Sequence, residues 1–323
     1  MTNIAVKWLA KAAVQRVISF SPHKHELNHR LQRFTGRDGI DGGHVVNRAS
    51  MVRRHLQALE MIGVERSGAS LPAGTSVLEL GTGWHPVVPM IFFLVGADRI
   101  VTVDHVDHLT AAALAHTAQV VLGAVDDGSL RGEVGDLVPE RVELLRSLAG
   151  SGATTDLATS VAALRLERAI GDVMALRLDE PVDIVVSNHV LEHLPEAILA
   201  PVLAACFELC RPGGVMSHAA DMIDHGHYVD ERLGEFNFLR FTERQWRIVG
   251  NDVQYENRLR LPSYRAAYAA AGVPIDHEEV LRSDVSEILR IPIAREFRHL
   301  SLDDLAVQFA WFVSLRPAVD GSA

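Results

Sequence analysis

Val77-Leu78-Glu79-Leu80-Gly81-Thr82-Gly83-Trp84-His85-Pro86 is the stretch of sequence that decides the fold. An apolar run that ends in an acidic residue stops at a glycine-rich turn, and a second apolar run ending at Asp104 follows. This order predicts a buried strand, a turn whose backbone can approach a ligand, and a carboxylate placed to hold a ribose. The segment therefore predicts a site for a nucleoside-bearing cofactor.

The composition is that of a globular protein and argues against several classes. The chain has 323 residues, enough for one large domain or for a domain with a substantial lid. Its formal net charge of −10, with no long Lys/Arg cluster, argues against a general nucleic-acid binder. Cys206 and Cys210 stand four positions apart in a predicted helix, and a core helix face explains them better than a disulfide or a metal site.

No apolar run in the sequence is as long as a membrane span. The first twenty residues are mildly hydrophobic, but Lys7, Lys11 and Arg16 interrupt them, which is typical of an amphipathic helix and not of a signal peptide. We expect this helix to pack on the domain, with binding to a membrane surface as the alternative. The expected location is the cytoplasm, and a homo-oligomer is left open.

From Thr75 onward the pattern alternates between short apolar strands and helices. Continuous apolar runs suit strands that are buried on both faces of a parallel sheet, with helices as right-handed crossovers. The predicted strands are 76–81, 99–104, 166–171, 182–188 and 213–219, and a C-terminal pair near 275–282 and 306–315 resembles an added antiparallel hairpin. The expected fold class is α/β, a doubly wound, Rossmann-like sheet of seven mostly parallel strands.

Three segments depart from this rhythm. Residues 1–70 are predicted to form an N-terminal helical cap, whose glycine-rich stretch 35–44 is either a connector or a lid loop over the cofactor. Two or three helices are expected in an insertion at 107–165. Residues 221–262, rich in His, Phe, Tyr and Trp, are interpreted as a substrate lid. The cofactor-binding core then spans 71–220 and is completed by 263–323.

The glycine turn does not fit a dinucleotide. Such turns need a third small residue, Gly-x-Gly-x-x-Gly, so that a helix N-terminus can meet the pyrophosphate. Here the third position is Pro86, and no P-loop lysine follows. We therefore expect a ligand without phosphates, in which the backbone approaches an amino-acid moiety and a ribose. An NAD-dependent oxidoreductase is the disfavoured alternative from another class.

Residues 70–220 resemble the class I S-adenosylmethionine (SAM)-dependent methyltransferases, of type 11 or 12. Glu79–Gly83 is similar to their first motif, and four further motifs follow in the same order: Ile100–Asp104, Gly171–Met174, Asp183–His193 and Leu209–Gly214. The resemblance implies that Asp104 binds both ribose hydroxyls and that Asp172, with Val173, frames the adenine. The cofactor-binding residues that it implies are Glu79, Gly81, Thr82, Gly83, Asp104, His105, Asp172, Val173 and Asn188.

Titratable residues gather just after the fourth predicted strand. His189, Glu192 and His193 lie at i, i+3 and i+4, so on a helix they would share one face. His218 ends the neighbouring fifth strand. The set resembles the Glu-x-x-Glu-His metal sites of small-RNA 2′-O-methyltransferases and ubiquinone-pathway O-methyltransferases. We predict His189, Glu192, His193 and His218 as ligands of Mg²⁺ or Mn²⁺, ahead of Zn²⁺, although histidine in place of the first glutamate weakens the case for Mg²⁺.

The same residues have other interpretations. His189 could be a metal-free general base, or the set could be structural, as in the class I methyltransferases that share Val-Leu-Glu-His without using a metal. Asp221 and His225 follow the fifth strand at the same sheet edge. They are candidates for substrate binding, for the base or for a metal shell, with a solvated loop as the alternative.

The predicted function is a SAM-dependent O-methyltransferase acting on a hydroxyl of a small molecule, with His189, His225 and Asp221 as catalytic residues. A saccharide is the favoured acceptor, because the aromatic lid with Asn257, Arg258 and Arg260 suits sugars and the pattern resembles bacterial, including actinobacterial, saccharide methyltransferases. The aromatic residues could instead form the lid's own small core. A metal-independent N- or C-methyltransferase of a small metabolite is the alternative.

Overall fold

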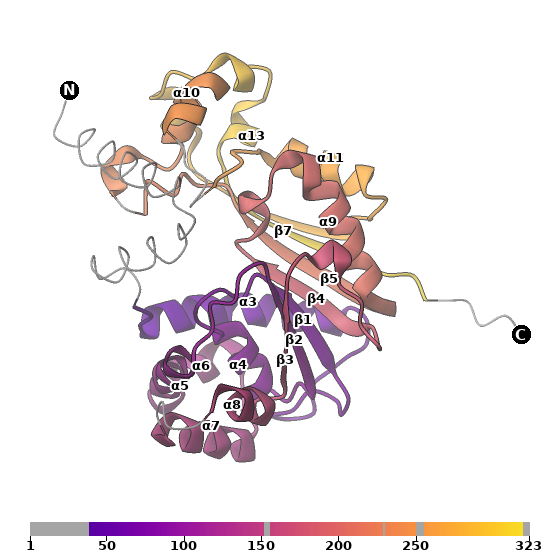
Figure 1. The fold of residues 1–323 in the computed structure, drawn as a ribbon. Coiled ribbons are helices and arrows are strands. Elements are labelled where there is room, and N and C mark those ends of the chain that lie inside the picture. The colour runs from indigo at the N-terminus through magenta and orange to yellow at the C-terminus, as the bar shows by residue number, and fades with distance from the viewer. Residues whose placement is uncertain (1–38, 152–155, 229, 250–254, 319–323) are drawn as a thin grey trace, which may run out of the picture.

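The computed structural model describes residues 39–151, 156–228, 230–249 and 255–318, and Figure 1 shows their arrangement. The predictions for the first twenty residues and for the start of the glycine-rich stretch lie outside the described residues. Seven strands form a single sheet in the order β3-β2-β1-β4-β5-β7-β6. This order reverses direction between β1 and β4, the point at which ligands bind in open α/β sheets.

All seven predicted strands are present, and the predicted α/β class is confirmed. The parallel strands are β1 (Ser76–Leu80), β2 (Arg99–Asp104), β3 (Leu166–Ile170), β4 (Val182–Asn188) and β5 (Cys210–Asp221). β7 (Val307–Leu315) runs antiparallel to β5, and β6 (His277–Arg282) runs antiparallel to β7. The C-terminal pair is therefore the predicted antiparallel addition to a parallel sheet.

The sheet carries a core on each face, because its central strands are apolar at consecutive positions. On one face, Val77, Ile184 and Val215 pack with the helices α3 to α8, which lie within residues 42–163. On the other face, Leu78, Val185 and Met216 pack with α9 (Glu196–Leu209) and α11 (Leu261–Ala270). Figure 1 shows the two sets of helices on opposite faces. The remaining helices are α3 (Gly42–Glu60), α4 (Val87–Leu94), α5 (Ala111–Asp126), α6 (Ser129–Val134), α7 (Pro139–Ser151), α8 (Leu157–Ala163), α10 (Glu243–Val249), α12 (Val285–Leu289) and α13 (Leu302–Leu305). Short 3₁₀ turns are η2 (Val173–Ala175), η3 (Leu191–His193), η4 (Glu231–Leu233), η5 (Asn237–Arg240) and η6 (Arg295–Phe297).

The insertion between β2 and β3 holds more helices than predicted. Four helices, α5 to α8, lie in its described part, and two of them, α6 with 6 residues and α8 with 7, are too short to be recognised by apolar periodicity. Asp41 caps α3, since its side chain accepts a hydrogen bond from the His44 N–H at 2.8 Å. The predicted glycine-rich interruption therefore ends at Asp41, and Gly42 and Gly43 begin a helix.

The lid segment shares a small hydrophobic core with residues 285–306. Phe236, Phe238 and Leu239 pack with Ile288 and Leu305, and Figure 1 places α10 beside α13. Phe236 and Phe238 are therefore core residues, in agreement with the alternative in which the lid aromatics are structural. None of the described helices has the length and apolar character needed to cross a membrane.

Two arginines predicted to face a sugar are used inside the lid. Arg260 is 1% exposed, and its guanidinium donates hydrogen bonds to the carbonyls of Met222 and Leu305 at 2.6 and 2.8 Å. Arg258 donates to Phe241 O and to a Glu243 carboxylate oxygen at 2.6 and 2.8 Å. Neither guanidinium is left to bind a sugar, so this part of the saccharide argument is not supported.

Candidate functional site

A cavity of ≈ 300 Å³ lies at the carboxyl ends of β1 and β4. Its walls come from the glycine turn after β1, the start of α4, the end of β4 and the N-terminal part of α3. The lining residues are Gly39, Ile40, His44, Arg48, Glu79, Gly81, Thr82, Gly83, Trp84, His85, Val87, Val88, Asn188 and His189. Five of the predicted cofactor residues, Glu79, Gly81, Thr82, Gly83 and Asn188, are therefore brought together here.

The two glycines of the turn do different work. Gly81 has φ +80, and a Cβ there would lie 2.4 Å from Val190 Cγ2, so the side chain is excluded by the neighbouring loop. Gly83 has φ +69, but a Cβ there would meet no protein atom within 4 Å among the described residues. The space over the Gly83 backbone is therefore open, and its contact with a ligand stays a prediction.

The other predicted cofactor residues follow the turn along the sheet edge. Asp104 ends β2, and its carboxylate accepts the Gly83 N–H at 2.7 Å and the Val106 N–H at 3.3 Å. His105 is exposed beside it. Asp172 is exposed after β3, where it caps η2 by accepting the Met174 N–H at 2.9 Å, and Val173 is buried in the core. These four residues do not line the cavity, and their contacts with a ligand stay a prediction.

Arg48 and Glu79 place opposite charges in the cavity. Glu79 is 4% exposed, and burial raises its pKa to about 7 while the positive charge of Arg48 opposes the shift. Burial lowers the pKa of Arg48, and the carboxylates of Glu79, Glu192 and Asp221 oppose that change. Sequence reasoning missed Arg48. The signal was present, since Arg48 and His55 fall on the apolar stripe of α3 that contains Val45 and Val52.

His189 lies in the left-handed backbone region with φ +57 and directs its ring toward two acids. Its Nδ1 is 3.6 Å from Glu192 Oε1 and 3.7 Å from Asp221 Oδ2. The predicted helix through 189–193 is wrong, because only Leu191–His193 forms a 3₁₀ turn and α9 begins at Glu196. His189 and Glu192 still meet, but through the left-handed turn and not through helical spacing.

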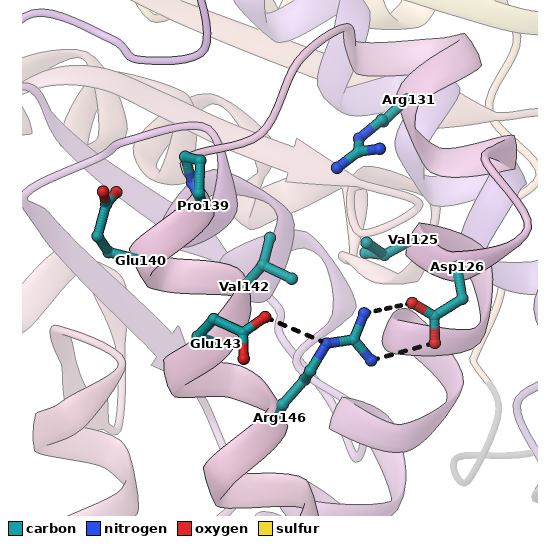
Figure 2. Close-up of a pocket in the computed structure, with 8 residues that line it drawn as sticks. All are labelled: Val125, Asp126, Arg131, Pro139, Glu140, Val142, Glu143 and Arg146. Atoms are coloured by element: carbon teal, nitrogen blue, oxygen red, sulfur yellow. Dashed lines mark hydrogen bonds and ion pairs between the residues drawn. The ribbon is translucent and has the colours of Figure 1, made fainter.

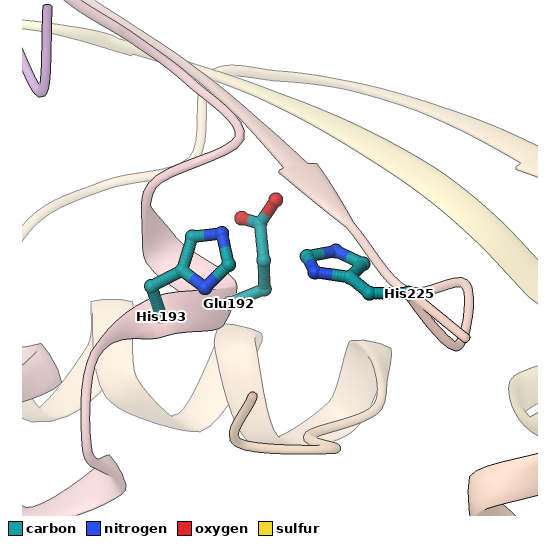
Figure 3. A group of neighbouring side chains, drawn as sticks. All are labelled: Glu192, His193 and His225. Atoms are coloured by element: carbon teal, nitrogen blue, oxygen red, sulfur yellow. The ribbon is translucent and has the colours of Figure 1, made fainter. Parts of the chain in front are cut away.

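Glu192 is at the centre of this cluster. It is 2% exposed, neither carboxylate oxygen has a hydrogen-bond partner among the described residues, and burial raises its pKa to about 8. One ligand atom each from Glu192, His193 and His225 lie within 4.8 Å of one another (Figure 3). The same spacing holds for His189, Glu192 and Asp221. Both groups have the composition of a divalent-cation site.

The lid segment orients part of the cluster. His193 Nδ1 donates to the Tyr255 carbonyl at 2.6 Å, which leaves Nε2 with its lone pair. Tyr228 Oη donates to Asp221 Oδ2 at 2.7 Å, and His225 Nε2 lies 3.7 Å from the same oxygen. Tyr228 was not predicted as a site residue, because nothing local in the sequence links it to Asp221.

The structure does not bring His218 to this cluster. It pairs with Ser187 across β4 and β5, and the Ser187 hydroxyl and His218 Nδ1 are 2.5 Å apart. Alternation along β5 places His218 on the same face as Met216, which packs in the core beneath α9 and α11. The ring is fully buried, burial lowers its pKa to about 3, and it belongs to neither candidate ligand group.

A second hollow, of ≈ 490 Å³, lies between α5, α6 and α7, away from the sheet edge (Figure 2). Arg146 forms a bidentate pair with Asp126 and lies 3.6 Å from Glu143. Among the described residues that line this hollow, no buried side-chain nitrogen or oxygen lacks a hydrogen-bond partner, in contrast to the sheet edge.

No family model matches the chain, and no curated protein matches it. Among solved structures it is similar to magnesium protoporphyrin IX methyltransferase from Synechocystis PCC 6803 with bound SAH, at 11% identity and a TM-score of 0.45, over 94% of this chain and 99% of that one. It is also similar to geranyl diphosphate C-methyltransferase from Streptomyces coelicolor A3(2), in complex with Mg²⁺, geranyl diphosphate and S-adenosyl-L-homocysteine. That match has 11% identity and a TM-score of 0.40, over 81% of this chain and 79% of that one. Matches this distant do not assign an activity or a substrate.

Proposed function

We propose that the chain is a SAM-dependent O-methyltransferase that methylates a hydroxyl group of a small molecule. The observation that carries the proposal is the adjacency of two features at one sheet edge. The cavity of the glycine turn meets, at His189, a cluster of histidines and buried acids that also contains Glu192 and Asp221.

The residues around the turn fit the cofactor. The space over the Gly83 backbone is open, and the Asp104 carboxylate accepts a hydrogen bond from the Gly83 N–H. Glu79 and Arg48 offer charges opposite to those of the ammonium and carboxylate groups of an amino-acid moiety. When bound, SAM supplies an electrophilic methyl group on a sulfonium. The chain's own part is to bind and orient both substrates and to exclude water.

The cluster fits the acceptor half of the reaction, because a neutral hydroxyl is a poor nucleophile and must lose a proton. Burial lowers the pKa of His189 to about 4, so its imidazole is uncharged near neutral pH, and a role as base requires a nearby negative charge to stabilise its protonated form. Asp221 lies within 3.7 Å of the rings of both His189 and His225, where its charge would stabilise a protonated imidazole.

The cluster also fits a divalent cation, which would act as a Lewis acid on the acceptor hydroxyl. Glu192, His193 and His225 would hold it, with His189 and Asp221 adjacent, and Glu192's unpartnered oxygens support this assignment. Two imidazoles and one carboxylate favour Mn²⁺ or Zn²⁺ over Mg²⁺. His218 is not part of the proposed set.

A saccharide is the acceptor class that we propose to test first. The buried phenylalanines do not support a saccharide acceptor, but two tyrosines beside the cluster do. Tyr228 is 61% exposed and Tyr255 is 39% exposed. Exposed tyrosine rings are the kind of surface on which sugar rings stack. The cytoplasmic location stays a prediction from the sequence.

Calorimetric titration with SAM, S-adenosylhomocysteine and NAD tests the cofactor. We expect the two adenosyl ligands to bind and NAD not to bind, because Pro86, the N-cap of α4, stands where a pyrophosphate-binding turn needs a third small residue. Binding of NAD alone would overturn the proposal. A screen of acceptors for the mass of one added CH₂, with fragmentation of the product, then shows whether oxygen, nitrogen or carbon is methylated.

Chelation tests the metal. EDTA should abolish turnover and Mn²⁺ should restore it, whereas His193→Gln should stay inactive in Mn²⁺ and His218→Gln should retain metal dependence. If the chelated enzyme keeps full activity, the alternative of a metal-free general base remains, and His189→Ala then becomes the variant expected to lose turnover.

A further inference from the structure

A directed chain of hydrogen bonds crosses the core between β7 and the cavity. Trp311 Nε1 donates to Ser217 Oγ at 3.1 Å, Ser217 Oγ is 2.9 Å from His55 Nδ1, and His55 Nε2 is 3.2 Å from Asn188 Oδ1. Trp311, Ser217 and His55 are at most 2% exposed, and Asn188 is 6% exposed. The chain joins α3, β4, β5 and β7 beneath the site.

The chemistry of these groups fixes the direction of every bond. The amide oxygen of Asn188 can only accept, so His55 carries its proton on Nε2 and donates it to that oxygen. The uncharged ring then has only a lone pair on Nδ1, so the Ser217 hydroxyl donates to Nδ1 and accepts from the indole N–H of Trp311. Burial lowers the pKa of His55 to about 3, so the ring is uncharged and the tautomer does not change over the working pH range.

The last group in the chain is left with an unused donor. Asn188 Nδ2 is buried and has no hydrogen-bond partner among the described residues, and Asn188 lines the cavity together with Arg48. Because His55 holds the amide oxygen, the amide cannot turn to present oxygen to the ligand. An unpaired buried N–H₂ group is costly unless a ligand accepts from it.

We propose that Asn188 Nδ2 donates a hydrogen bond to the carboxylate of the cofactor's amino-acid moiety, and that His55 is the positioning residue that fixes the amide in this orientation. Arg48 supplies the positive charge on the same wall, and Glu79 is left for the ammonium group of the ligand. This inference rests on the proposed function, because it assigns the amino-acid end of the proposed cofactor.

Two ligands that share a nucleoside separate this contact from the rest of the site. S-adenosylhomocysteine carries the amino-acid moiety, and 5′-methylthioadenosine lacks it. Asn188→Asp keeps the side chain's shape but replaces the donor with an acceptor. We expect this substitution to lower the affinity for S-adenosylhomocysteine by at least about tenfold in calorimetry. The affinity for 5′-methylthioadenosine should stay within about threefold of the wild-type value. Equal affinity of both proteins for S-adenosylhomocysteine would overturn the assignment.

His55 is tested by a pair of substitutions. His55→Gln keeps a donor toward Asn188, whereas His55→Leu removes it. The leucine variant should lose about tenfold in affinity for S-adenosylhomocysteine, and the glutamine variant should recover most of that loss. A ¹⁵N spectrum of the wild-type imidazoles should show His55 as the Nε2–H tautomer at every pH tested. Loss of affinity for both ligands in the leucine variant, without rescue by glutamine, would reduce His55 to a packing residue.

Two further variants keep the outcomes apart. Asp104→Ala should lower the affinity for both S-adenosylhomocysteine and 5′-methylthioadenosine, because both ligands carry the ribose. Ser314→Ala removes a buried β7 hydroxyl outside the chain of hydrogen bonds and should change neither affinity. If wild-type protein binds neither ligand, the proposed function itself fails. If it binds both equally well, only the assignment of Asn188 fails.

Discussion

At the scale of single residues, the site is defined by ionisable groups held in unusual protonation states. The Glu192 carboxylate is buried with no hydrogen-bond partner among the described residues, and burial raises its pKa. Burial also raises the pKa of Glu79 and lowers that of His189. Buried groups that lack ordinary partners are costly to a fold, and they concentrate where ligands or chemistry compensate for that cost. This is why the cluster is assigned to function and not to packing.

Glu192 predicts how stability depends on pH. Its folded-state pKa, about 8, lies above the ordinary value of 4.5, so its protonated form favours folding. The stabilisation is complete below 4.5 and is lost as the pH rises through about 8. Glu192→Gln cannot lose a proton, so without metal its stability relative to wild type should rise with pH, by about 2–4 kcal/mol in total.

Urea unfolding in EDTA at a series of pH values measures this difference. Glu79 titrates in both proteins, and its pKa is set by burial, Thr82, Arg48 and Asp104 and not by Glu192, so its contribution cancels in the comparison. Parallel pH curves for the two proteins would show that Glu192 is not held protonated. Addition of Mn²⁺ should raise the free energy of unfolding of the wild-type protein at high pH and not that of Glu192→Gln, because a bound cation compensates the ionised carboxylate. The difference in stability between the two proteins should then become smaller.

At the scale of secondary-structure elements, the sequence predicted the strands well and the site loop poorly. Strands such as β1 and β4 are continuous apolar runs bounded by turn residues, and that signal is local. The backbone of His189 is left-handed, which helical spacing cannot reveal. The contact between His55 and Asn188 spans 133 positions, so it depends on the assembled sheet and not on any local pattern.

The glycine turn after β1 predicts two different mutant phenotypes. Gly81→Ala should destabilise the protein by about 2 kcal/mol or more, because φ is +80 and the new Cβ meets Val190 at 2.4 Å. Gly83→Ala should cost about 1 kcal/mol from its positive φ alone, yet it should weaken cofactor binding, because its Cβ enters the open space over the turn.

Thermal unfolding and calorimetry on the two variants separate these effects. Gly81→Ala combined with Val190→Ala should recover part of the lost stability, since it removes the clashing methyl groups. A Gly83→Ala variant that binds S-adenosylhomocysteine as tightly as wild type would place the ligand elsewhere.

At the scale of the whole molecule, α3 connects the sheet to the cavity. Its buried residues pack in the core with β4 and β5, while His44 and Arg48 at its N-terminal end line the cavity. The hollow between α5, α6 and α7 belongs to the same side of the sheet but has no part in the cavity. Binding at the sheet edge should therefore affect α3 and the start of α4, which line the cavity, and not α7, which does not.

Hydrogen exchange measures this directly. Saturation with S-adenosylhomocysteine should slow exchange in the first two turns of α3 and in the turn at 81–85, because a bound ligand must leave before those segments open. Exchange in α7, which serves as the internal control, should not change. Unchanged exchange in α3 would mean that this helix does not contact the ligand.

The left-handed backbone of His189 carries a consequence for how this protein can change. Holding a non-glycine residue in that region costs about 1–2 kcal/mol. Glycine would adopt the same backbone at no such cost, but it would carry no imidazole between the two acids. Selection for heat resistance and selection for turnover therefore favour different residues at position 189. Under the proposed function, histidine at position 189 exchanges some stability for an imidazole between two acids.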